Sequence, residues 1–117
     1  MDILELQQKA WRIAEKAGWH QGRELRFGEF IALCHSELSE ALEIFREVGN
    51  TGIPKIKHVK SEIVDVYRPV GIPIELADVI IRIFDYCETK GISIHKAINV
   101  KNIFNEKRPY RHGNKVI

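Results

Sequence analysis

The chain has 117 residues, of which 44% are hydrophobic and 29% charged, and its formal net charge is only +2. This composition is ordinary for a soluble globular protein, and one domain of this length can bury a core without disulfides or metals to hold it together. No apolar run approaches the roughly 18 residues of a membrane-spanning helix. The start, MDILELQQKAW, has an early acid and no apolar signal core, so we expect no secretory peptide and a cytoplasmic protein.

The first half of the chain predicts two helices. Apolar residues recur near the helical period over residues 3–17, and Gly18 is a plausible stop. A polar connection follows, and a second helix is predicted for residues 29–47 before the turn-forming segment 49–52.

The segment 53–72 has no single regular pattern. Lys55–Lys60 is compatible with a short helix, whereas Glu62–Arg68 is rich in β-branched residues and is compatible with an extended chain. Pro69 and Gly71 interrupt either element. We therefore treat this segment as an insertion in a helical domain.

Two further helices are predicted after the insertion. The third runs from Pro73, a residue suited to the first helical turn, to about residue 89, and its apolar arc is wide enough for a central position or a subunit interface. The fourth covers residues 93–106 with Ser93 as its cap, and residues 107–117 form a basic tail that we expect to be mobile.

The two cysteines, Cys34 and Cys87, fall on apolar helix faces. Their spacing fits neither a metal site nor a disulfide framework. We expect both to be reduced core residues.

Four acids form two pairs, each with the spacing of one helical turn. Glu37 and Glu40 lie in the second predicted helix, and Glu75 and Asp78 lie in the third. Residues three apart are neighbours on a helix surface, so two adjoining helices would direct four carboxylates at one place. Hard divalent cations take such oxygen ligands, and the chain has no Glu-x-x-His motif of the di-iron proteins, so the pattern favours Mg²⁺, with Mn²⁺ possible.

Each acid also has a simpler explanation. Glu37 and Glu40 are compatible with solvated helix residues. With Pro73 as the first helical residue, Glu75 occupies the third position, where an acid caps free amides and favours the helix dipole. Asp78 is harder to explain in this way, because aspartate is a poor residue for a helix interior.

The fourth helix carries residues suited to a phosphate chain. Lys101 and Asn105 are four apart and Arg108 follows about one turn later, so a lysine, an amide and a guanidinium share one face. The alternative is a solvated basic helix end, which the helix dipole favours.

The ordered set of these motifs resembles the MazG-like all-α nucleoside triphosphate pyrophosphohydrolases, in particular their small stand-alone members. The resemblance covers roughly residues 28–48 and 72–115 and includes the wording HSELSEAL, IPIELADVIIRIFD and RPYRHGNK. It implies one helical domain over residues 1–117, a four-to-five-helix bundle that forms a homodimer or a homotetramer as a dimer of dimers. The chain departs from the family at Ser36, where many relatives have an acid, and in the 34 residues between the two acid pairs.

The resemblance also implies an activity, the Mg²⁺-dependent cleavage of a nucleoside triphosphate to the monophosphate and pyrophosphate, as in house-cleaning nucleotide metabolism. Carried over by position, Glu37, Glu40, Glu75 and Asp78 bind the metal. Phosphates are contacted by Lys101, Asn105 and Arg108.

Two further roles follow from the residues themselves. Glu40 is our candidate for the general base, because it lies furthest from the apolar arc of its helix. Trp19 is a candidate for stacking on the base of the nucleotide, with core packing as its alternative.

Two other functions stay open. A non-catalytic helical oligomer of the same scaffold would bind a partner protein or a nucleotide, which the wide apolar arc and Ser36 favour. A nucleic-acid-binding module would use the basic end, since residues 96–117 carry six basic residues and one acid, but residues 1–95 carry a net charge of −3, so nucleic acid is the weaker alternative.

Overall fold

The computed structural model describes residues 1–116. The predicted helical class is confirmed, with a small two-stranded sheet in addition. In chain order the elements are helices α1 (Ile3–Lys16) and α2 (Phe27–Gly52), strands β1 (Lys57–Lys60) and β2 (Tyr67–Val70), and helices α3 (Ile72–Lys90), α4 (Ile94–Lys107) and α5 (Arg111–Asn114). Within the described residues, no helix has both the length and the apolar character needed to cross a bilayer.

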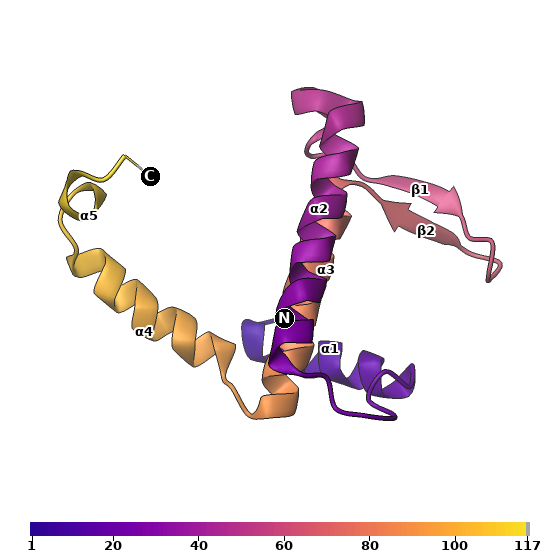
Figure 1. The fold of residues 1–117 in the computed structure, drawn as a ribbon, viewed down its shortest axis with the longest axis horizontal. Coiled ribbons are helices and arrows are strands. Elements are labelled where there is room, and N and C mark those ends of the chain that lie inside the picture. Colours follow the sequence, from indigo (N-terminus) through magenta and orange to yellow (C-terminus); the bar gives the residue numbers. More distant parts are fainter. Residues whose placement is uncertain (117) are drawn as a thin grey trace.

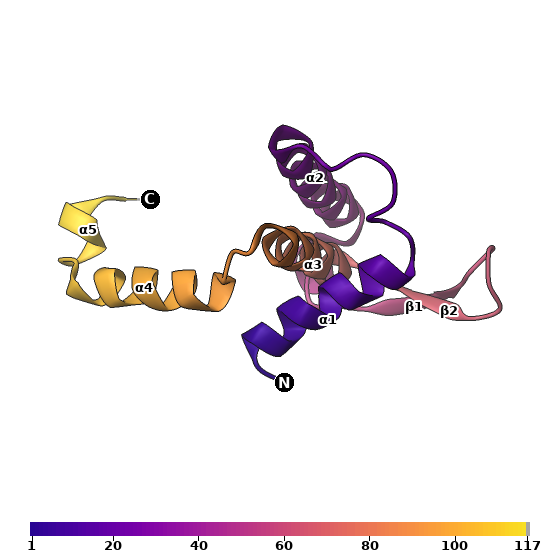
Figure 2. The same cartoon turned by 90° about the horizontal axis from the view of Figure 1, so that it is seen from below.

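Helices α2 and α3 run antiparallel and side by side, and α1 packs across α3 (Figures 1 and 2). The rings of Phe30 on α2 and Tyr86 on α3 stack with their centroids 4.1 Å apart. Phe27 packs against both rings. Cys34 and Cys87 are buried and free, which confirms the prediction for both cysteines.

The helix ends follow the signals in the sequence. Asp2 accepts a hydrogen bond from the amide of Glu5 at the start of α1, and Ser93 accepts one from the amide of Lys96 at the start of α4. Gly91 adopts the left-handed conformation that ends α3, as is common for glycine at this position. The regular part of α2 is interrupted at Gly49, whose φ is 65°.

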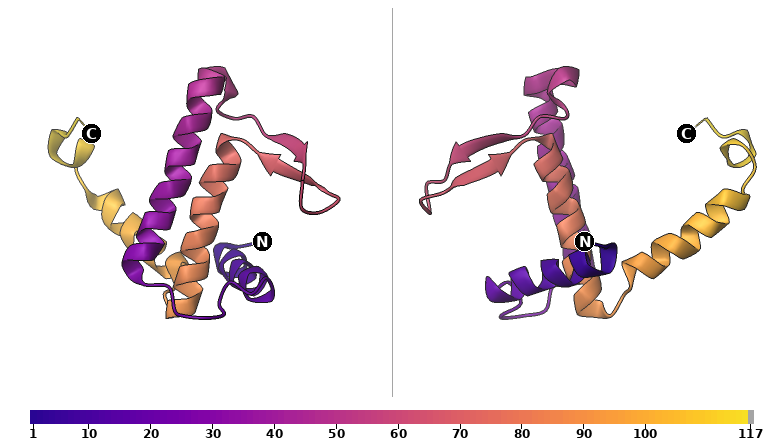
Figure 3. Two further views of the ribbon diagram at one scale, coloured as in Figure 1. Left: turned by 45° about the vertical axis from the view of Figure 1, so that its right-hand side comes forward. Right: turned by 180° about the vertical axis from the view of Figure 1, so that it is seen from behind.

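The insertion forms a β-hairpin, which projects from the α2–α3 pair (Figure 3). Strands β1 and β2 are antiparallel. The short helix considered for Lys55–Lys60 is therefore wrong, because this segment contains β1. The extended chain considered for Glu62–Arg68 is present only at the end of that segment, where β2 begins. Gly71 connects β2 to α3 with a φ of 135°, and a Cβ there would lie 2.5 Å from the carbonyl oxygen of Lys55.

Helix α4 leaves the other helices instead of packing beside them (Figures 1 and 2). Its direction is set by Gln7 of α1, which is 3% exposed. The Gln7 amide donates to the carbonyl of Ile92 and accepts from the backbone N–H of Ile94. The helices of one chain therefore do not close into the bundle that the sequence predicted.

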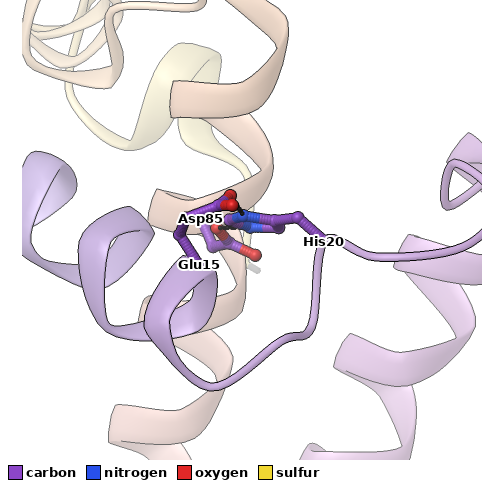
Figure 4. Close-up of polar contacts among 3 residues, drawn as sticks. All are labelled: Glu15, His20 and Asp85. Atoms are coloured by element: carbon purple, nitrogen blue, oxygen red, sulfur yellow. Dashed lines mark hydrogen bonds and ion pairs between the residues drawn. The ribbon is translucent and has the colours of Figure 1, made fainter.

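His20 links the end of α1 to α3 (Figure 4). Its Nδ1 lies 2.6 Å from Glu15 and its Nε2 lies 2.7 Å from Asp85, and its ring stacks on Trp11. Both ring nitrogens can donate to carboxylates only when the imidazole is protonated. Burial acts to lower the pKa of His20, but the hydrogen bonds to Glu15 and Asp85 outweigh it and raise the pKa above 6.5.

We expect His20 to make the stability of the fold depend on pH. Because the folded pKa is raised, the stabilisation is fully present below pH 6.5 and is lost as the pH rises through the folded value. The substitution His20→Gln should cost on the order of 1 kcal/mol at pH 5.5 and much less at pH 8.5, as measured by urea unfolding.

His58→Gln, on the exposed strand β1, is the matched control and should change little at either pH. Equal losses for His20→Gln at pH 5.5 and 8.5 would show that the imidazolium has no part in holding α1.

Candidate metal centre

Three of the four predicted acids converge between α2 and α3. Carboxylate oxygens of Glu37, Glu40 and Glu75 all lie within 4.8 Å of one another. Glu37 and Glu40 occupy consecutive turns in the middle of α2, whereas Glu75 lies in the first turn of α3. The antiparallel packing of α2 and α3 thus brings together acids that are separated by at least 34 intervening residues in the chain.

Asp78 lies outside this group of three. It is half-buried one turn after Glu75 on α3. Burial raises the pKa of its carboxyl group, and the charge of Glu37 raises it further. The charges of the cluster therefore affect the pKa of Asp78, but its carboxylate is not one of the three whose oxygens lie within 4.8 Å of one another.

Arg82 is a member of this site that the sequence did not single out. Its Nε and Nη2 donate to Oε1 of Glu37 at 3.1 and 2.9 Å. Burial opposes the ionisation of Glu37, but the hydrogen bonds from Arg82 and from the Glu75 carboxyl group lower its pKa. The spacing in the sequence could have indicated this residue. Arg82 lies four residues after Asp78 and seven after Glu75, so all three lie on one face of α3.

Glu75 carries the least compensated carboxylate of the site. Its Oε2 is buried and has no hydrogen-bond donor among the described residues. Burial, together with the neighbouring Glu37 and Glu40 carboxyl groups, raises the pKa of Glu75 to about 7. No side-chain hydrogen bond caps the start of α3, but Glu75 does lie in its first turn, where the helix dipole favours an acid.

This arrangement fits a hard divalent cation. An unpartnered buried carboxylate oxygen costs free energy unless a proton or a cation compensates it. The donors that converge are all carboxylate oxygens, which suit Mg²⁺ or Mn²⁺ rather than a softer metal. Among the described residues, one arginine, Arg82, pairs with an acid of this group, Glu37, so a proton or a cation has to offset the remaining negative charge.

The predicted phosphate ligands lie apart from this cluster within one chain. Lys101 and Asn105 are exposed on α4, and Arg108 follows that helix. Because α4 leaves the α2–α3 pair (Figure 1), they do not join the carboxylates in the isolated chain. Lys101 and Arg108 lie instead over the ring of Phe104.

The candidate base-stacking residue also lies at a distance from the acids. Trp19 is 79% exposed, in the turn after α1. Its neighbour His20 is bonded to Asp85, which lies ten residues after Glu75, or about 15 Å along a helix. Trp19 is therefore not packed in the core, and its role in base stacking stays a prediction.

We expect cation binding to be coupled to the release of a proton. Since the pKa of Glu75 is about 7, a cation must displace a proton from it at lower pH. The apparent Mg²⁺ affinity should therefore rise about tenfold per pH unit up to about pH 7 and then level off. Calorimetry in two buffers of different ionisation enthalpy, at pH 6 and pH 8.5, measures both the affinity and the proton release.

Glu47→Gln provides the control for this titration. Glu47 is exposed on α2, and the substitution should leave the pH profile unchanged. An affinity that is flat between pH 6 and 8.5 would mean that Glu75 is not a ligand.

Comparison of the chain with family models, with curated proteins and with solved structures found no match.

Proposed function

We propose that this chain is a Mg²⁺-dependent nucleotide pyrophosphohydrolase, which cleaves a nucleoside triphosphate to the monophosphate and pyrophosphate. Two observations support it best: the convergence of Glu37, Glu40 and Glu75, and the buried Oε2 of Glu75, which has no hydrogen-bond partner among the described residues. A cluster of carboxylates that can hold a divalent cation is typical of metal-assisted phosphate chemistry.

The residues of the site divide into distinct roles. Glu37, Glu40 and Glu75 would hold the cation, and Asp78 adds negative charge one turn away. When bound, Mg²⁺ neutralises phosphate charge and makes a water molecule more acidic. Arg82 fixes the rotamer of Glu37 through two hydrogen bonds to one oxygen.

Glu40 is the best candidate to accept the proton of the attacking water. It is the only exposed member of the three, and it has no ion pair with a basic side chain among the described residues. Glu37 is less suited, because Arg82 holds its carboxylate and lowers its pKa. A general base must reach the water with a free oxygen, which Glu40 can offer.

The proposed phosphate contacts come from Lys101, Asn105 and Arg108. Their charge suits pyrophosphate, on which negative charge develops as the bond breaks. In the isolated chain they are carried on an exposed helix, so this part of the proposal requires α4 to meet a carboxylate cluster in an assembled form of the protein.

The decisive experiment incubates the protein with a panel of nucleoside triphosphates and Mg²⁺, and measures monophosphate and pyrophosphate separately. We expect equal amounts of the two products, and no product after addition of a chelator. Release of inorganic phosphate with a diphosphate would indicate cleavage of the terminal bond instead. Nucleotide binding without turnover across the whole panel would favour the non-catalytic oligomer.

A further inference from the structure

Arg82 is the basic side chain that enters the carboxylate cluster. Its Nη2 lies 2.9 Å and its Nε lies 3.1 Å from Oε1 of Glu37. The Glu37 side chain is only 12% exposed and that of Arg82 is 39% exposed, so water screens this pair less than an ordinary surface ion pair. Because both donors end on the same oxygen, Oε2 is the Glu37 oxygen that Arg82 leaves free.

The next acid along each helix has a partner outside the cluster. On α2, Glu43 accepts a hydrogen bond from Arg46. On α3, Asp85 is bonded to His20. Within the described residues, the charged groups of the site are therefore Arg82 and the two acid pairs that the sequence predicted.

The charge of Arg82 decides how many cations the site can balance. When all four acids are ionised, they and the guanidinium have a net charge of −3. One divalent cation reduces this to −1, whereas a second would reverse the sign in a half-buried position, where charge is costly. With a neutral residue in place of Arg82, the net charge would be −4, which two divalent cations neutralise.

An arginine is suited to act as a fixed counter-charge. The guanidinium stays protonated in proteins, carries only donors and cannot ligate a cation. It is also more weakly hydrated than an ammonium group, which favours it in partly buried ion pairs. Arg82 lies four residues after Asp78 on one face of α3, so its charge acts on that acid as well as on Glu37.

We propose that Arg82 takes the place of a second metal ion, so that the carboxylate cluster holds a single divalent cation. Arg82 occupies Oε1 of Glu37 and supplies a positive charge that cannot dissociate. It is therefore a positioning residue and not a ligand. This inference rests on the proposed metal-dependent function, because it concerns the same site.

The test is the number of Mn²⁺ ions bound per folded chain, measured by calorimetric titration at pH 8 without nucleotide. We expect one ion for the wild type and two for Arg82→Met, which removes the charge and the donors but keeps an apolar stem. Two ions in one cluster lie about 3.5–4 Å apart, so they should also broaden each other's electron paramagnetic resonance spectrum.

Two further variants separate the charge of Arg82 from its bulk. Arg82→Lys keeps the positive charge and should bind one ion. Arg82→Gln keeps a donor but no charge, and it should bind two ions, so it replaces Arg82→Met if circular dichroism shows that variant to be unfolded. Arg46→Met is the matched control on the exposed surface of α2 and should bind one ion.

Two results would overturn the inference. The first is a wild type that binds two ions, which requires no variant. The second is a folded Arg82→Met or Arg82→Gln that still binds one ion. If such a variant also unfolds at a lower urea concentration than the wild type, Arg82 serves only to clamp α2 to α3.

The count of ions is measured without nucleotide, so it does not depend on turnover. One ion in the wild type and two in Arg82→Met, without pyrophosphate release from any nucleotide, would support the role of Arg82 and overturn the proposed function. Pyrophosphate release by a wild type that binds two ions would do the reverse. A wild type that binds no Mn²⁺ at millimolar concentration would overturn both.

Discussion

Glu75→Gln is expected to reduce Mg²⁺-dependent pyrophosphate release about 10³-fold or more, because the loss of a metal ligand removes several kcal/mol of transition-state stabilisation. The folded protein should at the same time become no less stable in the absence of metal. Glutamine keeps the shape of the side chain but removes a carboxyl group whose pKa is raised to about 7 by burial and by its acidic neighbours.

The combination of these two effects identifies a functional site. A residue that only supports the fold loses stability and activity together, whereas Glu75→Gln should lose activity alone. Between pH 4.5 and 7 the folded state binds more protons at Glu75 than the unfolded state, so the stability that this residue contributes falls as the pH rises. The unfolding midpoint of Glu75→Gln should therefore equal or exceed that of the wild type at pH 8.

Glu47→Gln is the matched control on α2, since it neutralises an exposed acid without touching the cluster. It should keep wild-type turnover. If Glu75→Gln and Glu37→Gln both hydrolyse nucleotides at the wild-type rate, the carboxylate cluster is not the catalytic site. If Glu75→Gln is inactive but also unfolded at 25 °C, the residue has a structural role instead.

Phe30→Ala is expected to give the largest loss of stability, about 3 to 5 kcal/mol. Phe30 is one of the few buried large side chains, at 7% exposed, and it stacks on Tyr86 with nearly parallel rings. This contact joins α2 to α3, the pair on which the carboxylate cluster depends. Urea unfolding followed by circular dichroism, at several protein concentrations to account for association, measures the loss.

Phe27→Ala is the control, because Phe27 contacts the same Tyr86 ring but is 63% exposed. It should cost about 1 kcal/mol, since little apolar surface leaves the core. Losses of similar size for the two variants would mean that the Phe30–Tyr86 stack does not anchor the helix pair.

Local signals account for most of the helices. Apolar periodicity, the caps at Asp2 and Ser93 and the left-handed Gly91 act over a few residues, so they can be read directly from the chain. The hairpin could not be read in this way, because its strands have only four residues each and their charged and apolar side chains do not alternate cleanly. Short strands are specified by their pairing, which here joins Lys57 to Val70 across the insertion.

For the candidate site, too, part of the arrangement follows from local sequence and part from the packing of the helices. The helical spacing in the chain was sufficient to group Glu37 with Glu40 and Glu75 with Asp78, because each pair lies on one helix. The packing of α2 against α3 determines which carboxylates lie close together. This packing leaves Asp78 outside the group of three. It also brings Arg82 to Glu37 across 45 residues; the spacing along α3 places Arg82 on the same face as Glu75 and Asp78, but it does not specify the partner on α2.

The position of α4 depended most strongly on distant contacts. Its helical character and its basic residues follow from its own sequence, but its direction is set by Gln7, more than 80 residues earlier in the chain. Short-range propensity and charge therefore specify what each helix is. Only long-range packing and hydrogen bonding specify where its side chains meet those of the others, because these free energies depend on contacts between residues far apart in the chain.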